Sequence, residues 1–295
     1  MVRQSEVVMK KGKLIVSVSG GKDSTAMCLH LFEQGYTKDD FERVFMDTGW
    51  EHPQTYKYLD ELEKVIGKIT RLKEKIKIRP EHEQYVKHFE SRLGFESPFV
   101  RRVILQCYFP SGLRRWCTID LKLKPLEKYF DSLDYEYINV VGIRKEESLK
   151  RSTMEEWEFN DRFDCWVWRP LIDWTEKDVI DIHHRFGLIP NRLYLTGNER
   201  VGCYPCIMAR KKEIKILEKD RIQFIADLER TVTKLKRERK GEDQPFVSMF
   251  NVHRNQMTTP IEEVVKWSKT SRGGKQFELF STEEPTCVRW GLCGL

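Results

Sequence analysis

The sequence contains no long hydrophobic run. Residues 1–13 carry no apolar segment of the signal-peptide type, and no stretch approaches the ~20 apolar residues of a membrane span. We therefore expect a cytoplasmic protein with no membrane partner. In a reducing compartment its eight cysteines do not form a disulfide framework. They are expected to be core residues, reactive thiols or metal ligands.

Several common site motifs are also missing. The seven histidines show neither H-x-x-x-H nor H-E-x-x-H spacing, and neither G-x-x-x-x-G-K-[ST] nor G-x-G-x-x-G occurs, which disfavours a P-loop NTPase. There are no internal repeats. Charge is nearly balanced, with 52 basic and 46 acidic residues and a net charge of +6. This balance permits a nucleic-acid partner without requiring one.

The most informative stretch is an apolar run at residues 14–18 that ends in a glycine-rich turn and continues as a helical pattern. Glycines let the backbone approach a ligand, and the N–H groups and dipole at a helix start favour a phosphate. The residues expected to form this phosphate site are Ser17, Ser19, Gly20, Gly21, Lys22, Asp23, Ser24 and Thr25.

The pattern after this turn alternates strand and helix, which predicts a doubly wound parallel α/β sheet. Strands are expected at residues 41–46, 68–78 and 135–142, and helices at 53–66, 119–130 and, after an N-cap at Thr175, 179–186. Ligands of such sheets sit beyond the carboxyl ends of the strands. Asp47 and Thr48 follow one strand, and Gly142 and Arg144 follow another.

The remaining segments divide the chain. Residues 79–116 are too long for an ordinary connection and are expected to be a substrate loop or a short helical insertion. Residues 208–240 predict a long charged helix or a helix pair that Gly241 ends. We expect an α/β domain at residues 1–200, which carries the phosphate loop, and a helical, cysteine-containing subdomain at 201–295.

The loop Ser-Gly-Gly-Lys-Asp-Ser resembles that of the PP-loop ATP pyrophosphatases, which hold the pyrophosphate of ATP while the α-phosphate is attacked. Further motifs are similar to the PAPS reductase branch, with its Rossmann-like, adenine nucleotide alpha hydrolase-like fold; they are Asp47-Thr48-Gly49-Trp50, Trp116-Cys117-Thr118 with Lys122, Gly142-Ile143-Arg144 with Glu147-Ser148, and Pro170-Leu171 with Trp174 and Asp178-Val179. The resemblance implies ATP and Mg²⁺ as ligands. It implies catalytic roles for Lys22, Asp23 and Ser24.

The same resemblance places Asp47 and Thr48 near the nucleotide, and Lys122, Gly142 and Arg144 near its phosphates.

The cysteines add a second feature. Cys203-x-x-Cys206 by itself fits a redox dithiol or half a zinc site.

Together with Cys117 this pair resembles the [4Fe–4S] arrangement of APS reductases, which have a Cys-Cys pair where this chain has Trp116-Cys117. Because such clusters take four thiolates, we expect Cys293 as the fourth ligand, with Cys287 as the alternative. Structural zinc remains open.

Three functions compete. A sulfonucleotide reductase would end in Glu-Cys-Gly-Leu-His and would carry a degenerate loop, whereas this chain ends Leu292-Cys293-Gly294-Leu295 and keeps the loop intact. An ATP sulfurylase small subunit has no use for the cysteines. A DNA phosphorothioation ATP pyrophosphatase combines an intact loop with cysteines that hold a cluster. In that class ATP adenylates a substrate oxygen, and sulfur from a cysteine desulfurase displaces AMP.

DNA phosphorothioation is therefore the preferred function, with DNA as acceptor and a cysteine desulfurase as sulfur donor. The alternatives are the sulfonucleotide reductase, a tRNA-thiolating PP-loop enzyme, and a nucleotide-sensing or nucleic-acid-binding protein without activity. An oligomer is possible, and the sequence does not decide its state.

Overall fold

The computed structural model describes residues 12–250, 259–270 and 289–290. In this part of the chain six strands form one sheet in the order β3-β2-β1-β4-β6-β5. Neighbouring strands are parallel except for the edge strand β5, which is antiparallel to β6. The expected doubly wound α/β class is confirmed. The strands are β1 (Lys13–Ser17), β2 (Phe41–Met46), β3 (Ile69–Leu72), β4 (Tyr137–Val141), β5 (Trp157–Asn160) and β6 (Cys165–Trp168).

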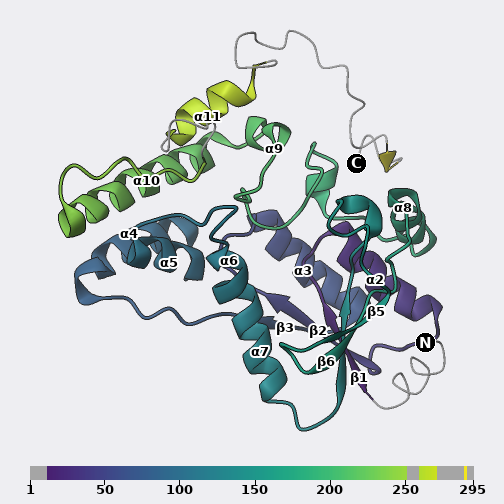
Figure 1. Cartoon of the computed structure of the whole chain (residues 1–295). Coiled ribbons are helices and arrows are strands. Elements are labelled where there is room, and N and C mark those ends of the chain that lie inside the picture. Colours follow the sequence, from purple (N-terminus) through teal and green to yellow (C-terminus); the bar gives the residue numbers. More distant parts are fainter. Residues whose placement is uncertain (1–11, 251–258, 271–288, 291–295) are drawn as a thin grey trace.

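Helices cover both faces of the sheet (Figure 1). Because successive side chains of a strand point to opposite faces, Leu14 and Val16 of β1 pack with one set of helices and Ile15 with another. The first face carries α2 (Lys22–Glu33), α3 (Pro53–Ile66) and α8 (Glu176–Arg185). The opposite face carries α7 (Lys124–Asp131). All three of these β1 side chains are at most 3% exposed.

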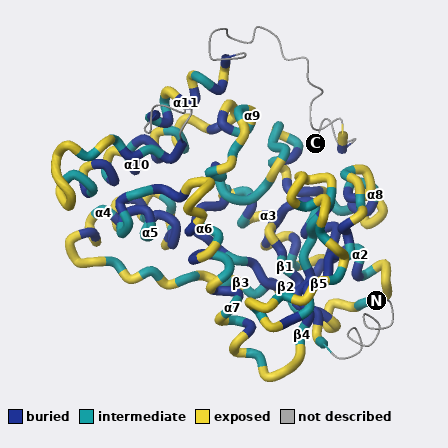
Figure 2. Tube along the Cα trace, viewed as in Figure 1, coloured by how far each residue is buried: buried dark blue, intermediate teal, exposed yellow. Residues whose placement is uncertain are grey.

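A second hydrophobic core lies beside the sheet. It joins α4 (Glu83–Leu93) and α5 (Pro98–Gln106) to α10 (Lys219–Lys240) and α11 (Ile261–Ser268). Figures 1 and 2 show these helices stacked, with buried segments between them. Residues 79–116 are thus a helical insertion, and the segment after residue 208 is a pair, α9 (Lys211–Lys215) and α10. The boundary at residue 200 stays a prediction.

Local signals placed most elements within a few residues. Thr175 is the N-cap of α8, with its hydroxyl accepting from the Asp178 N–H at 3.3 Å, but the helix already begins at Glu176. The helix expected at 119–130 begins at Trp116, as α6 (Trp116–Thr118), a π-helical turn η2 (Ile119–Leu123) and α7. The β5–β6 hairpin was not expected. Short 3₁₀ turns are η1 (Pro80–His82), η3 (Lys145–Glu147) and η4 (Arg192–Tyr194).

The search for membrane spans gives a negative result for the described residues. None of their helices is both long enough and apolar enough to cross a bilayer.

A buried carboxylate holds the C-terminal helices together. Glu229 of α10 is fully buried, and its two oxygens accept from the backbone N–H groups of Met249 at 2.8 Å and Ile261 at 3.0 Å. Burial raises the pKa of Glu229 to about 7. The hydroxyl of Thr233, one turn on, accepts from the Val247 N–H at 2.9 Å. These bonds fix the chain that follows α10 against that helix.

Glu229→Ala is expected to destabilise the protein by about 2–4 kcal/mol, because it leaves two buried N–H groups without an acceptor. Thermal or urea unfolding measures the change. Glu238→Ala, on the same helix with its side chain 52% exposed, is the control and should cost less than about 0.5 kcal/mol. Equal effects of the two substitutions would contradict this role of Glu229.

Candidate nucleotide and thiol site

The glycine-rich loop folds as expected between β1 and α2. Gly20 has a φ of +72°, which an L side chain rarely adopts, and Gly21 is the N-cap of α2. The Ser24 hydroxyl accepts from the Ser19 N–H and donates to the Gly21 carbonyl, each at 3.1 Å. The loop is therefore closed by its own side chains, and Ser17 and Thr25 lie on either side of it in β1 and α2.

Lys22, the first residue of α2, is 8% exposed. Its ammonium lies 3.2 Å from Glu176 Oε1 and 5.0 Å from the centre of the Tyr194 ring. The Tyr194 hydroxyl accepts from the Lys22 backbone N–H at 3.1 Å. The ammonium and the positive end of the α2 dipole thus lie at the same place, which suits a polyanion.

The end of β4 touches this loop. A Cβ atom on Gly142 would lie 2.9 Å from the Asp23 carbonyl oxygen, so only glycine permits this approach. Arg144, 4% exposed, places its Nε 2.5 Å from Asp23 Oδ1 and also pairs with Glu146. The structure thus brings Gly142 and Arg144 against the loop, with Asp23 as the partner of the arginine, and their contact with nucleotide phosphates stays a prediction.

Asp47 and Thr48 lie at the end of β2, at the same edge of the sheet. Asp47 Oδ1 accepts from the Tyr56 hydroxyl at 2.8 Å, and Oδ2 lies 3.0 Å from Lys73 Nζ. The Thr48 hydroxyl donates to Glu51 Oε1 at 2.7 Å. Both residues are buried and held within the protein, and their contact with a nucleotide stays a prediction.

Trp50 connects this edge to the cysteine segment. Its carbonyl accepts from the Tyr204 N–H at 2.8 Å, and its indole N–H donates to the Pro205 carbonyl at 3.0 Å. The Arg221 guanidinium of α10 stacks on the indole at 3.7 Å and donates through Nε to the Tyr204 carbonyl at 2.7 Å. The segment from Cys203 to Cys206 is thus fixed on both sides.

Three cysteines predicted as ligands lie within electrostatic reach of one lysine. The pKa of Lys122 is raised, first by the negative charge of Cys203 and also by Glu51, Cys206 and Cys117. Burial raises the pKa of Cys203 to about 12 and also raises that of Cys117. Lys122 therefore lies near these thiols, and its expected contact with the nucleotide phosphates stays a prediction.

Cysteine is the residue type that holds iron–sulfur clusters, and Cys117, Cys203 and Cys206 supply three of the four thiolates that such a cluster takes. The described residues do not, as positioned, form a ready metal-ligand group of three or more His, Cys, Asp or Glu side chains. Cys287 and Cys293 lie outside the described residues. The complete ligand set, and the choice between iron–sulfur and zinc, therefore stay predictions.

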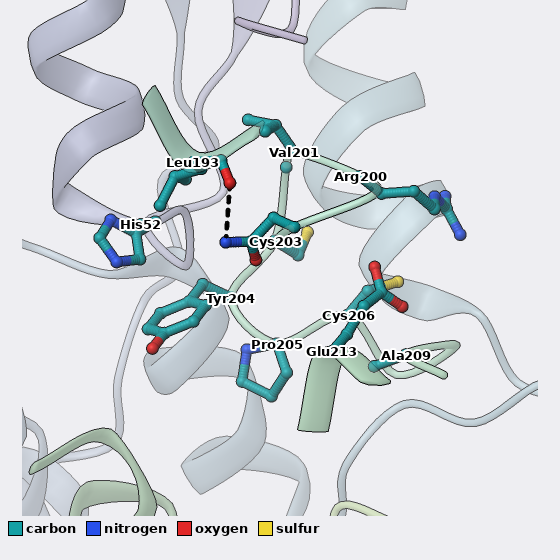
Figure 3. A pocket seen from close by; sticks show the side chains of 12 residues that line it. His52, Leu193, Arg200, Val201, Cys203, Tyr204, Pro205, Cys206, Ala209 and Glu213 are labelled. Carbon is teal, nitrogen blue, oxygen red and sulfur yellow. Dashed lines mark hydrogen bonds between the residues drawn. The ribbon is translucent and has the colours of Figure 1, made fainter. Parts of the chain in front are cut away.

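A small cavity of about 20 Å³ adjoins the cysteine pair (Figure 3). Cys203, Cys206, Arg200 and Glu213 line it, together with His52. A space of this size holds about one water molecule. A larger group at the thiols would therefore require these side chains to move.

The sequence did not identify the residues that hold the loop from a distance. Glu176 and Tyr194 contact Lys22 from more than 150 positions away. Thr175 and Asp178 marked the start of α8 and could have indicated that Glu176 begins a helix. No local signal shows where that helix packs.

His183 of α8, near the loop, makes the free energy of unfolding depend on pH. It is 1% exposed, its Nδ1 lies 2.7 Å from the Val179 carbonyl, and burial lowers its pKa to about 4. Between the ordinary value of 6.5 and about 4, the unfolded chain binds a proton that the folded protein does not. The free energy of unfolding therefore falls as pH drops through this window, by up to about 3 kcal/mol.

His183→Gln is expected to flatten the loss of stability between pH 6.5 and about 4. Urea unfolding at several pH values measures this slope. His184→Gln changes the exposed neighbouring histidine and should leave the slope as in the wild type. An unchanged slope in His183→Gln would show that other groups produce the acid sensitivity.

Comparison with known proteins shows which family the chain resembles. The family model described as the phosphoadenosine phosphosulfate reductase domain matches residues 13–209. A 37.8 kDa protein of Escherichia phage 186 is 32% identical, over 95% of this chain and 96% of that protein. An adenosine 5'-phosphosulfate reductase of Anoxybacillus flavithermus is 26% identical, over 57% of this chain and 63% of its own length.

Among solved structures, a phosphoadenylyl-sulfate reductase from Candida auris, in a phosphate complex, is similar with a TM-score of 0.48 and 14% identity. The similarity covers 70% of this chain and 87% of that chain. The present chain thus spans slightly less than two thirds of the Anoxybacillus reductase and most of the phage protein.

Proposed function

Because the chain belongs to the phosphoadenosine phosphosulfate reductase domain family, we propose that it is an ATP pyrophosphatase that activates a substrate oxygen for sulfur incorporation. The observation that carries this proposal is the complete Ser-Gly-Gly-Lys-Asp-Ser loop, closed by Ser19 and Ser24, with Lys22 buried at the N-terminus of α2. A site that only binds a nucleotide does not need this full set of anion-stabilising groups.

In the proposed reaction an acceptor oxygen attacks the α-phosphorus of ATP, and the bond to pyrophosphate breaks. Negative charge then develops on the leaving group. The ammonium of Lys22, the loop N–H groups and the α2 dipole are preorganised to stabilise it. Mg²⁺ is expected to arrive on the ATP phosphates, as it commonly does. Asp23 keeps Arg144 beside the loop.

The acceptor is proposed to be a DNA backbone oxygen, and the sulfur that displaces AMP is proposed to come from a cysteine desulfurase. Residues 1–200 would form the nucleotide domain and residues 201–295 the helical subdomain. A [4Fe–4S] cluster would be held by the thiolates of Cys117, Cys203 and Cys206, with Cys293 or Cys287 as the fourth. When bound, such a cluster supplies redox chemistry.

A sulfonucleotide reductase is the second candidate. The similarity to a named adenosine 5'-phosphosulfate reductase favours it. The two functions differ in product, since the first releases pyrophosphate from ATP and the second releases sulfite from a sulfonucleotide.

Lys22→Met is expected to reduce pyrophosphate release by about 100-fold or more, because it removes a preorganised positive charge from the leaving group. The assay supplies ATP, Mg²⁺, DNA and a cysteine desulfurase with cysteine. Lys177→Met, which changes a lysine side chain that is 81% exposed on α8, is the control. Sulfite release from a sulfonucleotide, with no pyrophosphate release from ATP, would establish the reductase instead.

Anaerobic purification of the protein and its cysteine variants tests whether the thiols hold iron. Cys117→Ala, Cys203→Ala and Cys206→Ala should each lower bound iron and the visible absorbance of thiolate–iron bonds, because each removes a ligand. Cys165→Ala, at the start of β6, should leave both unchanged. A wild-type protein with zinc and no iron would contradict the cluster.

A further inference from the structure

The ammonium of Lys22 already has a carboxylate partner. Glu176 Oε1 lies 3.2 Å from Lys22 Nζ, and Glu176 Oε2 lies 3.7 Å from Arg289 Nη1. The lysine side chain is 9% exposed, whereas the glutamate side chain is 41% exposed. One carboxylate thus lies between two cations, of which one is the predicted phosphate-binding lysine and the other comes from near the C-terminal end of the chain.

Trp290, next to Arg289, contacts residues that lie near the loop. Trp290 is 4% exposed and packs edge-on against His183, with ring centres 5.3 Å apart. It also packs against Tyr194 at 5.9 Å. Because the Tyr194 hydroxyl accepts from the Lys22 N–H, Trp290 contacts the side chain that supports the loop. This burial anchors Arg289 beside Glu176.

A carboxylate that pairs with an ammonium competes with any phosphate for it, and its own negative charge repels that phosphate. A cation on the far side of the carboxylate weakens both effects. Glu176 and Arg289 therefore have opposite influences on the affinity of Lys22 for an anion.

We propose that Glu176 is a built-in competitor for Lys22, and that Arg289, anchored by Trp290, draws the carboxylate away and so raises the affinity for the polyphosphate of ATP. Glu176, Arg289 and Trp290 are positioning residues, which act on the ligand through Lys22. The inference rests on the proposed function, since it assigns ATP to this loop, and it adds how the affinity is set.

The test is binding of inorganic pyrophosphate, and of a non-hydrolysable ATP analogue with Mg²⁺, measured by calorimetry on the full chain. Glu176→Gln should bind about three- to tenfold more tightly, and Arg289→Met about two- to fivefold more weakly, as expected for removing one partly exposed charge. Asp181→Asn, which changes an acidic side chain on α8 that is also 41% exposed, is the matched control and should bind as the wild type does.

The double variant Glu176→Gln/Arg289→Met gives the sharpest result. Because Arg289 acts through Glu176, the arginine substitution should have no further effect once the carboxylate is gone. Trp290→Ala should weaken binding as Arg289→Met does, and Trp290→Phe should keep most of the affinity by retaining the aromatic packing.

Unchanged or weaker binding by Glu176→Gln would overturn the inference, as would additive effects in the double variant. Thermal unfolding of each variant identifies a purely structural role, in which the melting temperature falls and the affinity does not rise. Lys22→Met separates this inference from the proposed function. If Lys22→Met abolishes binding while Glu176→Gln changes nothing, the ATP site stands and the inference fails. If the wild type binds neither ligand, both fail.

Discussion

The packing of one indole connects the parts of this protein. Trp50 is 1% exposed, and its ring lies between Phe99 of the helical insertion, at 4.4 Å, and the Arg221 guanidinium of α10, at 3.7 Å. Its polar atoms bond to the backbone of Tyr204 and Pro205. Because Trp50 directly follows the β2 end loop, these contacts determine how the second core sits against the sheet. An aromatic residue that is buried with its N–H satisfied fixes both distance and orientation.

The same contacts place the cysteine segment beside the end of β2, where the nucleotide site is predicted. Glu51, next to Trp50, pairs in a short β-bridge with Cys203 and accepts from the Thr48 hydroxyl at 2.7 Å. Asp47, Thr48 and Glu51 therefore form one hydrogen-bonded turn at the end of β2, and the cysteine segment pairs with it. Neither a sheet edge nor a cysteine pair alone produces this arrangement. It depends on residues 50 and 203–205 meeting across the fold.

The sequence predicted what local patterns encode. The apolar run before Gly20 marked β1, and the cap at Thr175 marked α8. The β5–β6 hairpin was not predicted because each strand is only four residues long and the turn at residues 161–164 contains neither Gly nor Pro. Contacts between distant segments were not predicted, for a different reason. Lys122 lies within electrostatic reach of Cys203, and no spacing rule predicts that proximity.

The predicted cations also proved to be partnered rather than free. Lys22 pairs with Glu176, and Arg144 pairs with Asp23. Burying an unpaired charge is costly, so a phosphate site assembled before its ligand arrives needs internal counter-ions. A ligand must then replace carboxylates that each carry one negative charge. A pyrophosphate group carries several charges and can bond to loop and lysine together, whereas a singly charged anion gains little over the carboxylate it displaces. Internal pairing of this kind therefore favours polyphosphates over weaker anions.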